Sequence, residues 1–254
     1  MMLLVDMGNS SIKWAILDQE HLAPQKRLLY TENTENLDNL LTQAWLSLDL
    51  PLSGVWVSNV AGPKKAEFLT HWIKSHWKLE PTFIKTSRSF CGVENGYKNP
   101  EELGVDRWLA LIGAYQLEKG MLCVVDCGTA VTLDVLSANG YHQGGLIIPG
   151  VTTMHNALFR NTYALAPLKK TLNEHSEKSF LAHDTSMGIT LGTLYAIIGS
   201  IEHVINTLEK QGNKVQLILT GGSASALESL LVIPYRLVPN LVLQGIKAVV
   251  KQLL

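Results

Sequence analysis

The amino-acid sequence predicts an α/β fold made of two similar halves. Along its 254 residues, apolar runs of four to seven residues alternate with longer segments of helical period. A weak internal repeat adds to this pattern. Leu3 to Ser10 resembles Leu122 to Thr129, with Asp6 and Asp126 120 positions apart, and another strand-like run follows each copy. We therefore expect two domains, residues 1–119 and 120–254, that face one another across a cleft.

The individual elements follow from the period of the apolar residues, which is two in strands and 3.6 in helices. The expected strands lie near residues 2–6, 11–17, 53–59, 121–126, 130–136, 143–148 and 215–220. The expected helices lie near residues 34–48, 63–77, 104–119, 186–210 and 240–253. Between them, residues 85–103 contain two glycines and a proline and are expected to form a long loop, and the polar stretch 169–184 a surface connection.

The composition excludes several classes of protein. Lys plus Arg (21) nearly balance Asp plus Glu (22), so no net field attracts nucleic acid or anionic lipid. The three cysteines, Cys91, Cys123 and Cys127, form no C-x-x-C pair and no metal-ligand spacing, which is typical of a reducing compartment. The longest nearly apolar stretch, 189–201, is shorter than the roughly 20 residues of a membrane span. We expect a soluble, cytoplasmic protein without nucleic-acid or membrane partners.

Each copy of the repeat ends in an Asp, a Gly and a short polar side chain, at Asp6 to Ser10 and at Asp126 to Thr129. Glycine lets backbone amides approach phosphate oxygens, and the Asp can hold a cation or its waters. Lys13 can also reach a phosphate if its strand turns that way. One such motif is equally typical of an ordinary hairpin turn, because Asp and Gly are common turn residues. Two copies favour a nucleotide phosphate.

A third motif has the form of a nucleotide-contacting turn. The expected strand ending at Thr220 runs into Gly221, Gly222 and Ser223, which open a helix. Paired D-x-G turns with a downstream T-G-G resemble the motifs of the hexokinase/actin-like ATPase superfamily, in which two ribonuclease-H-like domains clamp ATP between them.

Within that superfamily the chain resembles the type III pantothenate kinases over most of its length. Five segments carry the resemblance in the family's order: Asp6 to Ser10, Gly104 to Arg107, Asp126 to Ala130, Gly144 to Gly150 and Thr220 to Gly222. The resemblance implies ATP-dependent phosphorylation of pantothenate to 4′-phosphopantothenate, the first step of coenzyme A biosynthesis. It also implies a homodimer. We expect its interface around the helix at 104–119, with Trp108, Leu109 and Ile112 buried there.

The resemblance also implies roles for single residues. Asp106 matches the proton acceptor, and Asp126 matches the ligand of a monovalent cation, K⁺ or NH₄⁺, while Mg²⁺ accompanies ATP. The positions that match ATP contacts are Asp6, Met7, Gly8, Asn9, Ser10, Ser11, Ile12, Lys13 and Thr129. Those that match pantothenate contacts are Tyr97, Gly104, Val105, Asp106, Arg107 and Thr185. Ser10 and Cys127 depart from the residues common in the family, and the segment around Thr185 matches only loosely.

Two of these residues have a chemical rationale of their own. Phosphorylation of a primary alcohol needs a carboxylate within hydrogen-bond reach of the hydroxyl, and Asp106 can provide it. An Asp at a helix start also serves as a cap or dipole partner. Arg107 can bind a substrate carboxylate through two hydrogen bonds, or pair with a neighbouring acid at the surface. His142 and His155 are expected to be polar packing residues.

Other functions on the same fold stay open. Some relatives of the family were first described as transcriptional accessory factors, so an accessory protein without kinase turnover is the main alternative. The balanced charge and the lack of a DNA-reading motif argue against it. An ATP-driven filament or chaperone needs large inserted subdomains for which the chain has no room, and a phosphatase on this scaffold is a further possibility.

Overall fold

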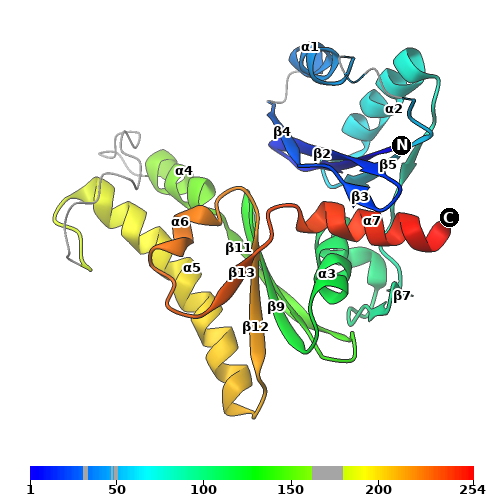
Figure 1. Ribbon diagram of the computed structural model, residues 1–254. Coiled ribbons are helices and arrows are strands. Elements are labelled where there is room, and N and C mark those ends of the chain that lie inside the picture. The colour runs from blue at the N-terminus through cyan, green and yellow to red at the C-terminus, as the bar shows by residue number, and fades with distance from the viewer. Residues whose placement is uncertain (31–33, 47, 49–50, 162–179) are drawn as a thin grey trace. The chain divides into compact units, whose positions relative to one another are not determined.

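The computed structural model describes residues 1–30, 34–46, 48, 51–161 and 180–254 (Figure 1). The chain forms two compact units. The first contains residues 1–119, 136–143 and 240–254, and the second contains residues 120–135 and 144–239. The chain thus changes unit between residues 119 and 120, and its last helix belongs to the first unit. Of the surface connection expected at 169–184, residues 169–179 lie outside the described part.

The first unit is built on a six-stranded sheet. Its strand order is β3-β2-β1-β5-β6, and β4 also pairs with β2. β1 runs antiparallel to β2 and parallel to β5, which is parallel to β6. The strands are β1 (Met2–Met7), β2 (Ser11–Asp18), β3 (His21–Leu22), β4 (Lys26–Leu29), β5 (Gly54–Asn59) and β6 (Pro81–Phe83).

The two faces of this sheet bury different residues, because successive side chains of a strand point to opposite sides. Val5 and Met7 of β1 pack in a core with Trp45 of α1 (Thr34–Trp45) and Trp72 of α2 (Pro63–Trp77). Asp6 therefore lies on the other face. That face is covered by α7 (Leu241–Leu253), which packs against β1 and β5.

The helix α3 (Val105–Leu117) packs closely against α7. A Cβ atom on Gly245 of α7 would overlap the carbonyl oxygen of Leu109, so the two backbones meet without a side chain between them. Trp108, Leu109 and Ile112 are 0 to 1% exposed within this unit. Our expectation that a subunit interface buries these three residues is wrong, because the chain's own packing already covers them.

Residues 85–103 do not form one long irregular loop, as we had expected. They contain a hairpin of β7 (Ser89–Phe90) and β8 (Val93–Glu94), followed by a 3₁₀ turn, η1 (Pro100–Glu102). The short strands pair locally, and Glu94 also bridges to Tyr141 in a parallel manner. The segment is therefore fastened at its middle, just before Tyr97.

The second unit has a five-stranded sheet in the order β11-β10-β9-β12-β13. β12 lies parallel to both β9 and β13. The strands are β9 (Met121–Cys127), β10 (Ala130–Leu136), β11 (His142–Pro149), β12 (Val215–Thr220) and β13 (Tyr235–Leu237), and the helices are α4 (Val151–Asn161), α5 (Thr185–Lys210) and α6 (Ser225–Glu228).

Among the described residues, α5 alone is long and apolar enough to qualify by composition as a membrane span. One face of this helix packs in the core of the second unit through Leu194, Ile197 and Ile201, which are fully buried. A hydrophobic face directed at a sheet accounts for the apolar composition. We therefore interpret α5 as a core helix.

Candidate active site

The first D-x-G motif forms a tight turn between β1 and β2. The backbone N–H of Gly8 donates to the carbonyl of Ser11 over 3.0 Å, and the hydroxyl of Tyr30 donates to the carbonyl of Gly8. Asn9 and Ser10 are exposed at the tip. The side chains of Met7 and Ile12 are fully buried in the core, so these two residues can offer a ligand only their backbone groups.

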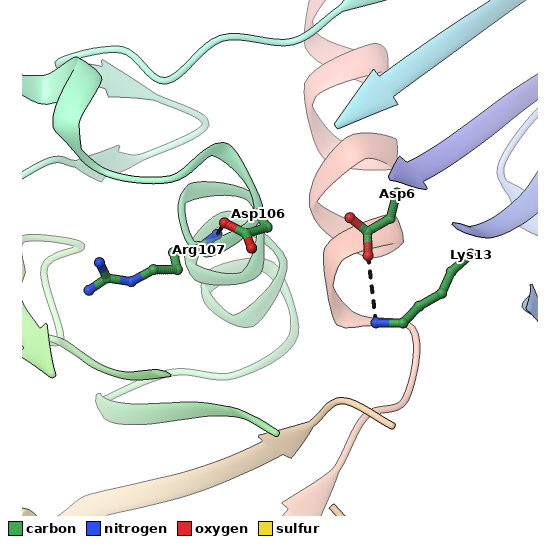
Figure 2. A network of polar contacts seen from close by, with 4 residues as sticks. All are labelled: Asp6, Lys13, Asp106 and Arg107. Carbon is green, nitrogen blue, oxygen red and sulfur yellow. Dashed lines mark hydrogen bonds and ion pairs between the residues drawn. The ribbon is translucent and has the colours of Figure 1, made fainter. Parts of the chain in front are cut away.

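Lys13 lies next to Asp6 at the base of this turn (Figure 2). The two residues are directly opposed in the antiparallel register of β1 and β2, and Lys13 Nζ lies 3.6 Å from Asp6 Oδ2. Asp6 is only 6% exposed. A partly buried ion pair keeps one positive and one negative group beside the exposed turn, where a phosphate and its cation would need them.

The helix α3 begins with the segment that we expected to bind substrate. Asp106 is half-buried, and its Oδ1 accepts a hydrogen bond of 2.8 Å from the backbone N–H of Arg107. A Cβ atom on Gly104 would lie 2.7 Å from this oxygen, so a side chain at 104 would displace the carboxylate. The cap interaction and a catalytic role are compatible here, because a carboxylate has further acceptor sites.

Arg107 points to the opposite side of α3 from Asp106 (Figure 2). It is 6% exposed, and its Nη1 donates to the hydroxyl of Tyr97 over 3.0 Å. The guanidinium carbon also lies 5.6 Å from the centre of the Tyr97 ring, a cation–π distance. Arg107 is therefore no surface arginine, and the structure brings together two residues expected to bind substrate.

The second D-x-G motif forms a turn between β9 and β10. Here the backbone N–H of Gly128 donates to the carbonyl of Ala130 over 3.0 Å. The carbonyl of Thr129 accepts hydrogen bonds from the N–H of Gly150, at 2.9 Å, and from the hydroxyl of Thr153, at 2.6 Å. The G-G-L-I-I-P-G segment thus supports this turn, and Thr129 stays exposed.

The T-G-G motif packs against the second D-x-G turn. Thr220 pairs with Asp126 in the parallel register of β12 and β9, and Ser223 N–H donates to the carbonyl of Cys127 over 3.0 Å. Gly221 has a φ of +94°, and a Cβ atom there would overlap the Asp126 carboxylate. The second D-x-G, G-G-L-I-I-P-G and T-G-G segments, far apart in the sequence, therefore meet in the second unit.

Cys127 lies among these turns, but its thiol is unreactive. Burial, with a smaller contribution from the charge of Asp126, raises its pKa to about 12. A thiol with this pKa stays protonated near neutral pH and is a poor nucleophile. The site therefore has no cysteine chemistry at this position.

Thr185 lies at the start of α5 and is exposed. The Asp184 side chain before it caps the helix by accepting a hydrogen bond of 2.8 Å from Met187 N–H. Thr185 lines a mostly apolar cavity of about 680 Å³ between α4 and α5, together with Met154 and Leu158. It belongs to the second unit, whereas Tyr97 and Gly104 to Arg107 belong to the first.

The described residues include no group of three or more His, Cys, Asp or Glu side chains that could form a metal centre. Ser58 of β5 is level with Asp6 of β1, and its fully buried Oγ has no hydrogen-bond partner among the described residues. A carboxylate and a hydroxyl suit the water ligands of Mg²⁺. The Asp126 carboxylate lies close to Gly221, where the second D-x-G and T-G-G segments meet, and can offer an oxygen ligand to a cation.

The family model for type III pantothenate kinase matches residues 2–207 of this chain. The type III pantothenate kinase of Nitrosococcus oceani is 40% identical, over 99% of this chain and 94% of the relative. That of Nitrosomonas eutropha is 35% identical, over 98% and 94%. The chain belongs to the type III pantothenate kinase family. Members of this ATP-dependent family catalyse the first step of coenzyme A biosynthesis, so the family and reaction that the sequence predicted are confirmed.

The fold is confirmed by solved structures. The ethanolamine utilization protein EutJ from Carboxydothermus hydrogenoformans superposes with a TM-score of 0.59 at 15% identity, over 97% of this chain and 89% of that one. At this identity the likeness concerns the architecture alone. It agrees with the expected α/β fold of the actin-like ATPases.

Two residues that support the site from outside had no signal in the sequence. Thr153 holds the Thr129 carbonyl from α4, a helix that we did not expect because its first two turns are mostly polar. His142, which we expected to be a packing residue, lies against Tyr97. Both contacts join residues more than 20 positions apart, and only tertiary structure reveals them.

Proposed function

We propose that this kinase transfers the γ-phosphoryl group of ATP to the primary hydroxyl of pantothenate with Asp106 as general base. The observation that carries the proposal is the start of α3, which has a half-exposed carboxylate at 106 and, on the opposite side of the helix, a buried guanidinium at 107 (Figure 2). Pantothenate has a hydroxyl at one end and a carboxylate at the other. One side chain therefore suits each end of the substrate.

The phosphates of ATP bind the two D-x-G turns. Backbone N–H groups at exposed turns, including those of Asn9, Ser10 and Thr129, donate to phosphate oxygens. Lys13 adds a positive charge at the first turn, where it is held 3.6 Å from Asp6. Because little covalent chemistry falls to the protein in phosphoryl transfer, this positioning supplies much of the rate.

Pantothenate binds through Arg107, Tyr97 and the first turn of α3. The guanidinium offers a carboxylate a planar pair of donors, and the Tyr97 hydroxyl fixes its orientation. Asp106 accepts the proton of the primary hydroxyl as the oxygen attacks the γ-phosphorus. General-base assistance of this kind is worth about 10²–10⁴ in rate. The family resemblance adds Thr185, at the start of α5, to the residues proposed to contact the substrate.

Asp6, Ser58 and Asp126 are the residues that would hold the cations. When bound, Mg²⁺ and a monovalent cation, K⁺ or NH₄⁺, neutralise charge on the phosphates and on the transferring group. Without them, the carboxylates of Asp6 and Asp126 would repel the polyphosphate.

We also propose a cytoplasmic homodimer. Its interface lies on the exposed apolar side chains of α4 and α5, which include Leu158, Phe159 and Tyr195, each about 40% exposed. The alternative, an accessory protein on the same fold without turnover, has no specific observation in its favour.

The test is a coupled assay that follows ADP release from ATP and pantothenate, with mass-spectrometric detection of 4′-phosphopantothenate. We expect pantothenate-dependent turnover in potassium buffer. Asp106→Asn provides the matched inactive control. ATP binding without a phosphorylated product, in any of potassium, ammonium or sodium, would contradict the kinase assignment and favour the accessory protein.

A further inference from the structure

His142 is buried against a residue of the site without belonging to it. Its side chain is 0% exposed, and its ring stacks on that of Tyr97 with 5.6 Å between centroids and 20° between planes. Such an offset stack of two flat rings defines the plane of each. The Tyr97 hydroxyl oxygen in turn accepts a hydrogen bond from Arg107 Nη1. The three side chains therefore form a continuous series from His142 through Tyr97 to Arg107.

The backbones on the two sides of this stack are fastened together. A Cβ atom on Gly96 would overlap the carbonyl oxygen of His142, so the residue before Tyr97 leaves no room for a side chain. Two positions earlier, Glu94 N–H donates to the carbonyl of Gly140 over 2.8 Å. The segment that carries His142 thus directly supports the segment that carries Tyr97.

The backbone around Tyr97 has further supports that do not involve His142. Asn95 is fully buried, and its Oδ1 accepts a hydrogen bond of 3.0 Å from Tyr97 N–H. Arg88 Nη1 donates to the carbonyl oxygens of Asn95 and Tyr97, each at 2.8 Å. Because these bonds hold the loop, the His142 ring acts on the orientation of the Tyr97 ring and not on the path of the chain.

We propose that His142 is a positioning residue for substrate specificity, which sets the plane of the Tyr97 ring and through it the orientation of the Arg107 guanidinium. The inference rests on the proposed function, in which that guanidinium binds the carboxylate of pantothenate. His142 touches no reacting group. Its loss lowers the affinity for the acidic substrate, because a guanidinium that turns freely makes fewer paired hydrogen bonds.

Steady-state kinetics of His142→Ala test the proposal. We expect the KM for pantothenate to rise about tenfold, with the KM for ATP unchanged and kcat within about threefold, since uniform substrate binding is lost and the phosphate site is untouched. His142→Phe keeps a flat ring and should restore most of the affinity. His203→Ala on the exposed face of α5 is the matched control and should behave as the wild type.

A double-mutant cycle makes the test specific to the Tyr97 hydroxyl. Tyr97→Phe removes the oxygen that Arg107 contacts, so in this background His142→Ala should add less than about twofold to the KM for pantothenate. Full additivity of the two changes would overturn the proposal, as would an unchanged KM in His142→Ala. A fall in kcat and a rise in both KM values by similar factors, with a lower melting temperature in both His142 variants, would also overturn the proposal. That result would show that His142 has a structural role only.

The wild-type protein separates this inference from the proposed function. If the wild type phosphorylates pantothenate and the His142 variants have the same kinetics, only the positioning role is refuted. Wild type that neither phosphorylates nor binds pantothenate in calorimetry defeats both. If the wild type binds pantothenate without turnover, the affinity of the His142 variants for pantothenate, measured by calorimetry, decides the positioning role.

Discussion

Asp6 and Lys13 face each other across β1 and β2, with 3.6 Å between Asp6 Oδ2 and Lys13 Nζ beside the first phosphate-binding turn. Lys13→Met keeps the apolar stem and removes the charge. We expect the KM for ATP to rise about tenfold or more, because a hydrogen bond to a charged group is worth about 1.5–3 kcal/mol.

Lys251→Met is the matched control for this substitution. Lys251 also pairs with a carboxylate, Glu20, at 2.6 Å, but on the exposed surface of the same unit. Exposed ion pairs contribute little, so its kinetics should match the wild type. A KM for ATP that is unchanged in Lys13→Met would remove Lys13 from the nucleotide site.

Asp106→Asn is expected to fold normally and to lose most of its turnover, by about 10²–10⁴-fold. The fold is retained because the Asn Oδ1 can still accept the hydrogen bond that Asp106 takes from Arg107 N–H. Circular dichroism checks the fold, and initial rates at saturating ATP and pantothenate measure the turnover. Near-wild-type rates would show that the side chain is only a helix cap.

Gly8→Val and Gly128→Val are expected to abolish ATP binding with little effect on secondary structure. A Cβ atom at Gly8 meets no atom closer than 3.5 Å, and at Gly128 none closer than 3.4 Å, so the space it enters is the space the phosphates need. Calorimetric titration with ATP measures the affinity. Gly199→Ala, whose added Cβ has open space in α5, is the control. Wild-type affinity in both valine variants would contradict the two-turn model.

Activity is expected to require potassium or ammonium, and Asp126→Asn to relieve or abolish this requirement. A monovalent ion near the second turn would stabilise negative charge that develops in the transition state. The measurement compares rates in sodium, potassium and ammonium chloride at matched ionic strength. Equal rates of the wild type in all three salts would refute the role of the ion even with kinase activity established.

Gly245→Ala is expected to destabilise the protein by about 1–3 kcal/mol, the usual range for overpacking. The added methyl would overlap the Leu109 carbonyl, which is rigid helical backbone, so α3 and α7 would have to separate. Midpoints of urea unfolding measure the change. Gly199→Ala is again the control. Its free energy of unfolding should rise by about 0.5–1 kcal/mol, because the added methyl has open space there. No loss in Gly245→Ala would contradict the close crossing of the two helices.

Strong periodicity made the main elements predictable from sequence. The expected strand at residues 130–136 and the helix at 63–77 agree with β10 (Ala130–Leu136) and α2 (Pro63–Trp77) to the residue. The elements we did not expect give a weaker signal. Strand β13 has only three residues, too few to show a period. Helix α4 has Val151, Met154 and Leu158 at helical spacing, but most residues of its first two turns are polar.

The candidate site also has parts that local sequence predicts and parts that it does not. Turn chemistry alone indicated the positions of Gly8 and Gly128, because strand, Asp and Gly in succession lead into a tight turn. The contact between Tyr97 and Arg107 is different. The nine residues between them could adopt many paths, and the path taken depends on Asn95 and on the bridge from Glu94 to Tyr141, far along the chain. Local sequence does not contain that information, although the family resemblance named both residues.

The return of α7 to the first unit has a consequence for how the protein is made. When residues 1–119 have left the ribosome, the face of α3 that α7 will cover, including Leu109, still lacks its partner. About 120 more residues must follow, which takes roughly 6–24 s at about 5–20 residues per second. The nascent chain therefore exposes this apolar face of α3 throughout that interval, until α7 is made and covers it.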